Sequence, residues 1–175
     1  MKSTKVYLSL GGNEGQVLPR LQQALTLLSA QPGIANLKFS HFYQTAPFQV
    51  ESPCWFVNAV CSFQTFFSPD DIFAITQLVE IQLGKVPKPK NASRPIDIDF
   101  LFYGDCNCQG RELKIPHPCW KERLFVLVPL ADLMQEVILQ GTAGPEHYSL
   151  PALIQPLLAE SPQAIYLLEK NLDLQ

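Results

Sequence analysis

The order of strand-like and helix-like patterns over residues 5–103 most constrains how this chain can fold. Apolar and β-favouring residues predict four strands, over residues 5–10, 37–45, 55–67 and 95–103. A predicted helix lies between the first two strands, and its apolar stripe consists of Leu18, Leu21, Leu25 and Leu28. A second predicted helix, from Pro69 to Leu83, lies between the last two strands. The order β-α-β-β-α-β predicts the α+β class with a ferredoxin-like antiparallel sheet and both helices on one face.

The second helix carries signals at both of its ends. Ser68 suits the N-cap, Pro69 the first helical position, and Asp70 with Asp71 the first turn, where carboxylates favour the helix dipole. Gly84 is expected to end the helix. The buried stripe is predicted to consist of Ile72, Ile75, Val79 and Leu83.

Residues after the fourth strand are expected to add elements to this sheet. The pattern predicts a helix over 124–134, a short edge strand over 137–139, and short helices over 150–158 and 164–170. We expect one domain over residues 1–175, because domains commonly run to roughly 100 to 200 residues.

The composition excludes several classes of protein. With 47% hydrophobic and 17% charged residues, the chain differs from a disordered one. A net charge of -3 argues against a broad basic face for nucleic acid or anionic lipid. There is no signal-peptide core and no run of roughly 18 apolar residues that could span a membrane, so we expect a cytoplasmic protein.

Five cysteines, an odd number, indicate free thiols in a reducing compartment. A structural zinc site built from Cys106, Cys108, His117 and Cys119 is the alternative. The single residue between Cys106 and Cys108 disfavours it, because two to four residues usually separate such a pair of zinc ligands.

Asp97 and Asp99 are the leading candidates for chemistry. Side chains of a strand alternate between faces, so both should share one face, with Cα atoms about 7 Å apart. The opposite face is predicted to carry Ile96, Ile98, Phe100 and Phe102. An ordinary solvated strand face is the alternative, but adjacent carboxylates repel unless a cation lies between them, and such oxygen pairs suit Mg²⁺ with bound phosphates.

A basic loop precedes these carboxylates. Its cations are Lys85, Lys88, Lys90 and Arg94. Arg94 lies three residues before Asp97, and its planar guanidinium can hold phosphate beside a metal. A solvated linker is the alternative for the lysines. Since neither a P-loop nor a G-x-G-x-x-G motif occurs, a bound triphosphate would be held by side chains and metal.

Four further residues are candidates for the site. Gln77 and Glu80 are neighbours on the second helix near the basic loop, although ordinary surface positions would explain them. His117 stands between two prolines and Arg123 follows, so a structural histidine and a preorganised phosphate donor are both open interpretations.

Taken together, these motifs resemble the 6-hydroxymethyl-7,8-dihydropterin pyrophosphokinases, folate-pathway enzymes that transfer pyrophosphate from ATP to a pterin alcohol. The matching blocks, in family order, are Leu10–Asn13, Phe42–Pro47, Phe56–Val60, Gln77–Glu80, Arg94–Asp99, Pro116–Pro118 and Arg123–Leu127. Arg-x-x-Asp-x-Asp followed by Pro-His-Pro is the most specific part of the resemblance.

The resemblance implies roles for individual residues. Asp97 and Asp99 would hold two Mg²⁺ ions and, with Arg94, His117 and Arg123, form the catalytic set. The residues implied to contact ATP are Gln77, Glu80, Lys85, Arg94, His117 and Arg123. Those implied to line the pterin pocket are Thr45, Ala46, Phe48, Phe56, Asn58 and Phe125, of which the three phenylalanines could equally be core. The partners are then two small molecules, with no nucleic acid and no membrane.

This chain departs from the family pattern mainly in the basic loop. Lys85 replaces an arginine typical of the family. Further departures are Gly12, Ala46, Pro87, Asn91 and Ser93. RNA-recognition modules share the predicted element order, but residues 55–67 lack their Lys/Arg-Gly-Phe/Tyr opening and the chain is acidic.

Overall fold

The computed structural model describes residues 3–48, 54–89, 92–160 and 163–169. Lys90 and Asn91 of the basic loop lie outside the described residues, as does Lys170 at the end of the last predicted helix.

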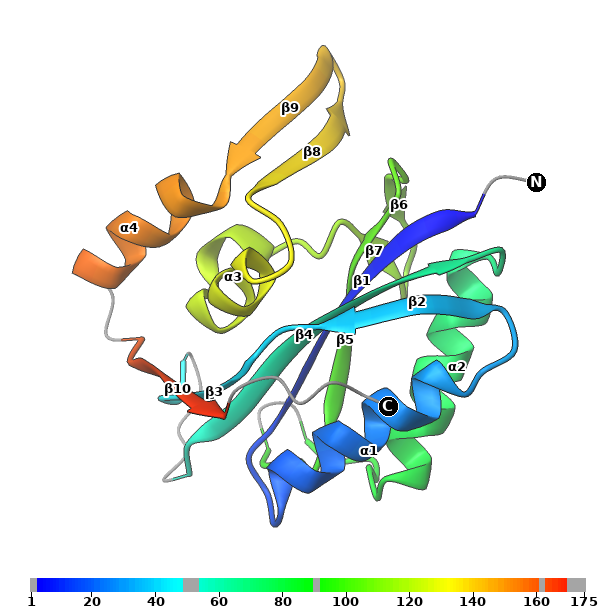
Figure 1. Ribbon diagram of the computed structural model, residues 1–175, viewed down its shortest axis with the longest axis vertical. Coiled ribbons are helices and arrows are strands. Elements are labelled where there is room, and N and C mark those ends of the chain that lie inside the picture. Colours follow the sequence, from blue (N-terminus) through cyan, green and yellow to red (C-terminus); the bar gives the residue numbers. More distant parts are fainter. Residues whose placement is uncertain (1–2, 49–53, 90–91, 161–162, 170–175) are drawn as a thin grey trace.

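An antiparallel sheet forms the centre of the molecule (Figure 1). Its strands are β1 (Thr4–Gly12), β2 (Ile34–Phe39), β3 (Phe42–Thr45), β4 (Phe56–Thr65), β5 (Asp97–Tyr103) and β10 (Ile165–Glu169). The order is β10-β3-β4-β1-β5, and β2 pairs with β4 beyond the end of β3. The predicted combination of an antiparallel sheet with helices is confirmed. The site-bearing strand β5 lies at one edge, beside β1.

Each face of the sheet is covered by its own hydrophobic cluster. Helices α1 (Val17–Ser29) and α2 (Pro69–Gln82) cover one face (Figure 1). Helices α3 (Leu124–Ala131) and α4 (Leu150–Glu160) lie on the other. The chain also forms two hairpins, β6 (Cys108–Gln109) with β7 (Lys114–Ile115) and β8 (Glu136–Gly141) with β9 (Gly144–Ser149), and a short 3-10 helix at Trp120–Glu122.

The predicted start of α2 is present in full. Ser68 Oγ accepts the backbone N–H of Asp71 at 3.2 Å, and the Asp71 carboxylate accepts the N–H of Ser68 at 3.0 Å. This reciprocal capping box satisfies two donors that a helix start leaves open. Gly84 follows the helix with φ of +93°, a conformation that glycine adopts without strain.

Strand β1 is longer than predicted, because Gly11 and Gly12 continue it. Close approach of neighbouring groups explains these glycines. A Cβ on Gly11 would lie 2.4 Å from Asn58 Oδ1, and one on Gly12 would lie 2.6 Å from the Pro95 carbonyl oxygen. The two glycines therefore lie where the sheet has no room for a side chain. Glycine also occurs where strands end, so residue type alone does not distinguish the two cases.

Strand β5 contains an irregularity that the alternation pattern did not predict. Tyr7 pairs with Phe102 and Leu8 with Phe100, so Leu101 is an extra residue in the register. Beyond such a bulge the side chains change faces. Ile98 and Phe100 belong to the α1–α2 cluster as predicted, but Phe102 joins Leu101 in the cluster beneath α3. The placement of Phe102 was therefore wrong.

Two other predictions about elements were wrong. The strand predicted over 37–45 is two strands, separated where Ser40 Oγ accepts the backbone N–H of Val60 at 2.9 Å. The helix predicted over 164–170 is strand β10, which pairs with β3. A short apolar run fits either element, and the available edge of β3 decides in favour of a strand.

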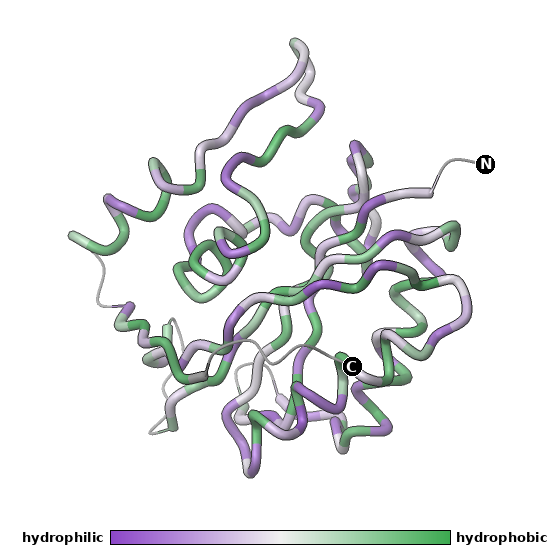
Figure 2. Tube along the Cα trace, viewed as in Figure 1, coloured by the Kyte–Doolittle hydropathy of each residue, from purple (hydrophilic) through white to green (hydrophobic). Residues whose placement is uncertain are grey.

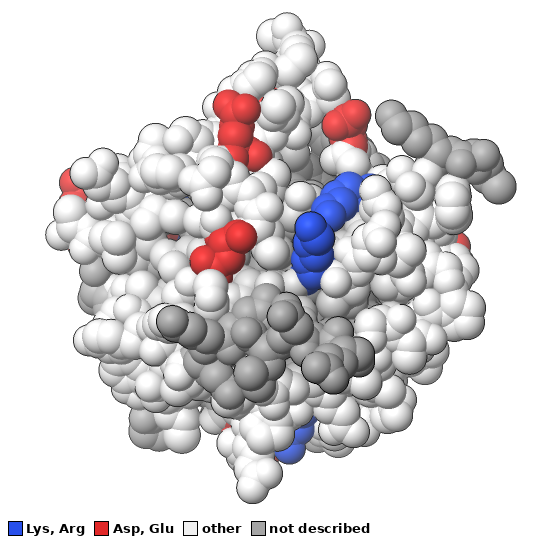
Figure 3. All heavy atoms as spheres, viewed as in Figure 1, with Lys and Arg blue, Asp and Glu red and all other residues white. Residues whose placement is uncertain are grey.

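Hydropathy and charge follow this layout. The apolar helix α3 faces the sheet, whereas β9 at the outer hairpin is mostly hydrophilic (Figure 2). On the face shown in Figure 3, the described Lys and Arg side chains do not form a broad basic surface. Within the described ranges, no helix is both long and apolar enough to cross a membrane.

The bulge in β5 predicts how two phenylalanines differ in their contribution to stability. Phe102 is buried and packs edge-on against Trp120, with ring centroids 5.1 Å apart. We expect Phe102→Ala to lower the free energy of unfolding by about 3–5 kcal/mol, because it leaves a cavity. Phe66→Ala is the control, since Phe66 is 63% exposed. Urea unfolding measures both, and equal effects would contradict the burial of Phe102 against Trp120.

Candidate active site

The site lies where β1 separates β4 from β5. Gly11 pairs with Asn58 on one side and with Asp97 on the other, and Ser9 pairs with Asp99. A pocket of about 280 Å³ opens over this part of the sheet. Its lining residues are Ser9, Gly11, Gly12, Thr45, Ala46, Phe48, Phe56, Asn58, Ala92, Arg94, Asp97, Asp99, His117, Arg123 and Phe125. The absence of a side chain at Gly11 leaves room between Asn58 and Asp97.

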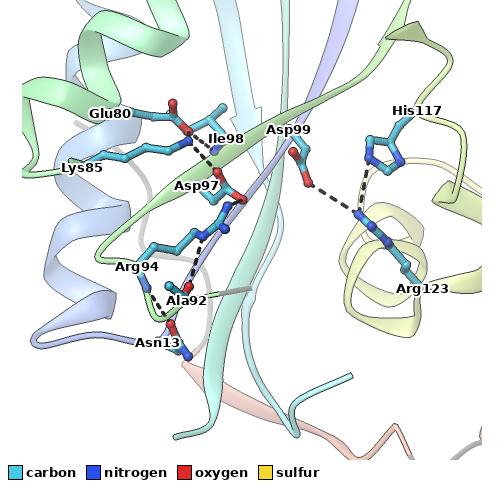
Figure 4. A network of polar contacts seen from close by, with 10 residues as sticks. All are labelled: Asn13, Glu80, Lys85, Ala92, Arg94, Asp97, Ile98, Asp99, His117 and Arg123. Carbon is cyan, nitrogen blue, oxygen red and sulfur yellow. Dashed lines mark hydrogen bonds and ion pairs between the residues drawn. The ribbon is translucent and has the colours of Figure 1, made fainter. Parts of the chain in front are cut away.

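Both carboxylate oxygens of Asp97 accept from cations of the basic loop. Lys85 Nζ donates to Oδ1 at 2.6 Å, and Arg94 Nη1 donates to Oδ2 at 2.7 Å (Figure 4). The Arg94 backbone is fixed, because its N–H donates to Asn13 Oδ1 at 2.9 Å and its carbonyl accepts the Asn13 N–H at 3.0 Å. Asn13, in the Leu10–Asn13 motif, thus holds the loop against β1.

Glu80 is a buried member of the same network, only 5% exposed. Its Oε1 accepts from Lys85 Nζ at 2.7 Å and from the Ile98 backbone N–H at 2.6 Å. Burial raises its pKa, and hydrogen bonding to Lys85 opposes that rise. The interpretation of Glu80 as an ordinary surface residue was therefore wrong. Gln77, its neighbour on α2, is exposed and lines neither pocket described here.

Asp99 has a different environment from Asp97. Among the described residues, its ion-pair partner is Arg123, whose Nη1 lies 3.6 Å from Oδ2, a weak ion pair. Desolvation, together with the negative charge of Asp97, raises the pKa of Asp99 above its ordinary value. The two predicted carboxylates therefore share one face, as the alternation predicted, but only one is closely paired with a cation.

His117 is positioned by the bulge in β5. Its backbone N–H donates to the carbonyl of the extra residue, Leu101, at 3.1 Å. Its Nδ1 accepts the Cys119 N–H at 3.2 Å, so the proton of a neutral ring is on Nε2. That atom lies 3.4 Å from Arg123 Nη1. Two donors from different segments therefore face the same side of the pocket, where an anion would accept from both (Figure 4).

The other half of the pocket combines one amide with aromatic rings. Asn58 is 4% exposed and donates through Nδ2 to Thr45 Oγ1 at 2.7 Å, which fixes the orientation of its carboxamide. Phe48, Phe56 and Phe125 are half-buried and line the pocket around it. Of these, Phe125 also lies beneath the Arg123 guanidinium, 5.5 Å from ring centroid to Cζ. Flat apolar walls with one oriented amide suit a planar heterocycle.

A second pocket of about 240 Å³ adjoins the first and shares Asp99 and His117 with it. Its other lining residues are Phe73, Ile98, Phe100, Arg111, Glu112, Leu113, Lys114 and Pro118. Arg111, Glu112 and Lys114 were not predicted as site residues, and Glu112 and Lys114 were left out because they depart from the pattern of the family that the sequence resembles. The hairpin β6–β7 brings them to the edge strand β5.

The donors available for a metal are two carboxylates. Among the described residues, no group of three or more His, Cys, Asp or Glu side chains is arranged to hold a metal. The zinc alternative built from Cys106, Cys108, His117 and Cys119 was therefore wrong, and all five cysteines are free thiols. A carboxylate pair beside a basic pocket still fits Mg²⁺, which usually keeps several waters and binds through one or two carboxylates plus substrate phosphates.

An antiparallel sheet covered by helices, with a carboxylate pair, cations and aromatic walls in one pocket, is typical of an α+β enzyme with a phosphorylated substrate. Residues 7–135 match the model of the 7,8-dihydro-6-hydroxymethylpterin-pyrophosphokinase (HPPK) family, and the chain belongs to that family. It is 42% identical over 132 residues to the 2-amino-4-hydroxy-6-hydroxymethyldihydropteridine pyrophosphokinase of Porphyromonas gingivalis, covering 73% of this chain and 89% of the relative. The enzyme of the same name from Bacillus subtilis is 34% identical over 138 residues, 79% and 83% of the two chains.

A solved structure shows the same fold in a longer protein. The wild-type HPPK-DHPS of Plasmodium falciparum superimposes with a TM-score of 0.68 at 15% identity. The match covers 90% of this chain but 45% of that one, so the chain spans less than half the length of that protein. At this level of identity, the likeness concerns the fold alone.

The environment of His117 predicts how its ring titrates. Burial, followed by the charge of Arg123, lowers its pKa from 6.5 to about 4. The unfolded chain therefore binds this proton first as the pH falls, and the resulting contribution to stability is lost from about pH 6.5 downward. In protein stripped of metal and nucleotide, NMR of the imidazole C–H signals should show His117 neutral at pH 6, with His117→Asn identifying the signal. A titration midpoint near neutral pH would contradict this environment.

Proposed function

We infer that this chain transfers pyrophosphate from ATP to 6-hydroxymethyl-7,8-dihydropterin in folate biosynthesis, releasing AMP. The chain is thus an ATP-dependent diphosphotransferase with two small-molecule substrates. The observation that carries this function is the meeting of two adjoining pockets at Asp99 and His117, in a chain that belongs to the HPPK family. One pocket has the chemistry of a heterocycle site, and their junction has the chemistry of a phosphate site.

The pterin is assigned to the first pocket. The hydrogen bond to Thr45 uses one N–H of Asn58 and leaves its other N–H and its Oδ1 lone pair for a ligand. This donor and acceptor pair complements the amide-like edge of a pterin, while Phe56 and Phe125 provide apolar walls for its ring. The hydroxymethyl group would then point toward the carboxylates of β5.

ATP is assigned to the second pocket and the junction. Arg111 and Lys114 give the second pocket positive charge, and Glu112 can accept hydrogen bonds from a ribose or a base. The phosphates would lie between Arg94 on one side and Arg123 with His117 on the other (Figure 4). Gln77, also expected to contact ATP, is exposed on α2 and lines neither pocket.

Asp97 and Asp99 are proposed to hold two Mg²⁺ ions. Support comes from their shared face on β5, and from the raised pKa of Asp99, which a nearby cation would lower. When bound, Mg²⁺ neutralises phosphate charge and aligns the attacking and leaving oxygens.

The cationic residues of the chain would act on the transferred group. Arg94 and Arg123 offset negative charge that develops on the phosphate oxygens, and His117 donates through Nε2. No general base is assigned, since none of the described groups is identified as one by its geometry. The pterin oxygen would displace AMP from the β-phosphorus.

The strand order also supports a finer description of the fold. With β2 and β3 counted as one strand, the order is that strand, then β4, β1 and β5, antiparallel throughout. This order supports the ferredoxin-like classification and a single pyrophosphokinase domain, with β10 added at the β3 edge.

The position of the label in the product tests the reaction. With ATP labelled on the γ-phosphate, Mg²⁺ and the reduced hydroxymethylpterin, we expect the label in the pterin product together with an equal amount of AMP. ATP labelled on the α-phosphate is the control, and its label should remain in AMP. Formation of ADP, or a reaction that does not depend on pterin, would refute the proposed function.

Asp99→Asn tests separately what this carboxylate contributes to turnover and to stability. We expect turnover to fall by at least about a hundredfold, because a metal ligand and a source of electrostatic stabilisation are lost. Stability should be unchanged or slightly higher, since the substitution removes a carboxylate that is disfavoured by burial and by Asp97. Asp105→Asn, an exposed carboxylate just after β5, is the control. Kinetics and thermal unfolding measure both, and a fully active Asp99→Asn would remove Asp99 from the site.

A further inference from the structure

The two carboxylates of β5 differ in how strongly this chain already neutralises them. Asp97 accepts from Lys85 at 2.6 Å and from Arg94 at 2.7 Å, so each of its oxygens has a cation. Among the described residues, Asp99 forms an ion pair with Arg123 alone, at 3.6 Å. A divalent cation that approaches the pair must therefore compete with the chain's own cations at Asp97 but much less at Asp99.

Of the two cations on Asp97, Lys85 is the one that can exchange. Arg94 is held by its backbone bonds to Asn13 and by a contact between its Nε and the Ala92 carbonyl. Lys85 is anchored at its backbone, where its N–H donates to the Glu80 carbonyl at 2.9 Å just beyond α2. Its side chain is 30% exposed, and an ammonium on a four-carbon stem can turn to a new acceptor without moving the backbone.

Glu80 keeps this ammonium within reach of the site. Its Oε1 is fixed by the Ile98 N–H at 2.6 Å, directly beside Asp97 on β5, and also accepts from Lys85 at 2.7 Å. Lys85 therefore bridges two acidic groups, one buried and one in the pocket. A change of partner at Asp97 need not release Lys85 into solvent.

We propose that Lys85 is a built-in counter-cation of Asp97, and that its transfer to the phosphates of a nucleotide is what opens Asp97 Oδ1 to a metal ion. This inference rests on the proposed role of Asp97 as a metal ligand. A metal ion alone competes with Lys85 and binds weakly. A nucleotide accepts Lys85 and frees the carboxylate, so nucleotide and metal each strengthen the binding of the other.

The test measures binding without turnover. Mn²⁺ binding to the full chain is followed by the EPR signal of the free ion, with and without the non-transferable analogue α,β-methylene-ATP. Lys85→Met removes the charge and keeps the length of the stem. We expect it to bind Mn²⁺ alone about tenfold more tightly than the wild type and to lose about tenfold of the coupling between Mn²⁺ and the analogue. Lys85→Gln should change both quantities in the same direction.

A matched control lies three residues away in the same loop. Lys88 Nζ pairs with Glu14 Oε2 and donates to the Ser93 carbonyl, with no bond to Asp97 among its described contacts. Lys88→Met should therefore bind Mn²⁺ alone like the wild type. If it tightens binding as much as Lys85→Met does, a general change in loop charge explains the effect and the proposal is overturned.

Asp97→Asn distinguishes a failure of this proposal from a failure of the proposed role of Asp97 as a metal ligand. If Asp97→Asn weakens Mn²⁺ binding while both Lys85 variants bind Mn²⁺ alone no more tightly than the wild type, Lys85 is not a competitor and only this inference fails. If Asp97→Asn leaves Mn²⁺ binding unchanged, the assignment of the metal to Asp97 fails as well. Circular dichroism of each variant confirms that the fold is retained.

Discussion

Repulsion between two carboxylates on alternate residues of β5 is the constraint that organises this site. Neighbouring negative charges raise each other's pKa, and positive charge must lie close by for both to stay ionised. The chain brings cations from three segments: Lys85 from the end of α2, Arg94 from the loop before β5, and Arg123 from the start of α3. The site is electrostatically uneven, because two of these cations lie on Asp97 and the third is only loosely paired with Asp99.

Departures from regular sheet geometry make room for the pocket and fix its residues. Gly11 leaves a bare position between Asn58 and Asp97, and the bulge at Leu101 directs a carbonyl to the N–H of His117. A regular β5 would have paired that carbonyl differently and would have kept Phe102 on the α1–α2 face. One extra residue therefore couples the packing beneath α3 to the position of His117 in the pocket.

This chain shares its fold with a solved HPPK-DHPS structure that is 15% identical to it. Its basic loop has a particular set of contacts around Lys85. The resemblance drawn from the sequence implies an arginine at the position of Lys85, and a lysine is a compact charge on a flexible stem rather than a planar fork. Its bridge between Glu80 and Asp97 follows from the close packing of α2 against β5. Lys85 therefore belongs to the basic loop and is at the same time an ion-pair partner of Asp97.

The sequence by itself determined the alternation of strands and helices up to β5, the capped start of α2, the shared face of Asp97 and Asp99, and the residues that line the first pocket beside Asn58. These follow from local rules, namely alternation along a strand, helix caps and motif resemblance.

Only the tertiary structure decided that Glu80 is buried against β5, that Phe102 changes faces, that residues 165–169 form a strand, and that Arg111 and Lys114 line the second pocket. Each of these depends on a neighbour distant in sequence: the Ile98 N–H for Glu80, the β1 register for Phe102, and the free edge of β3 for β10. Local pattern cannot specify such partners, because the free energy of a buried charge or an edge strand is set by what it meets in space.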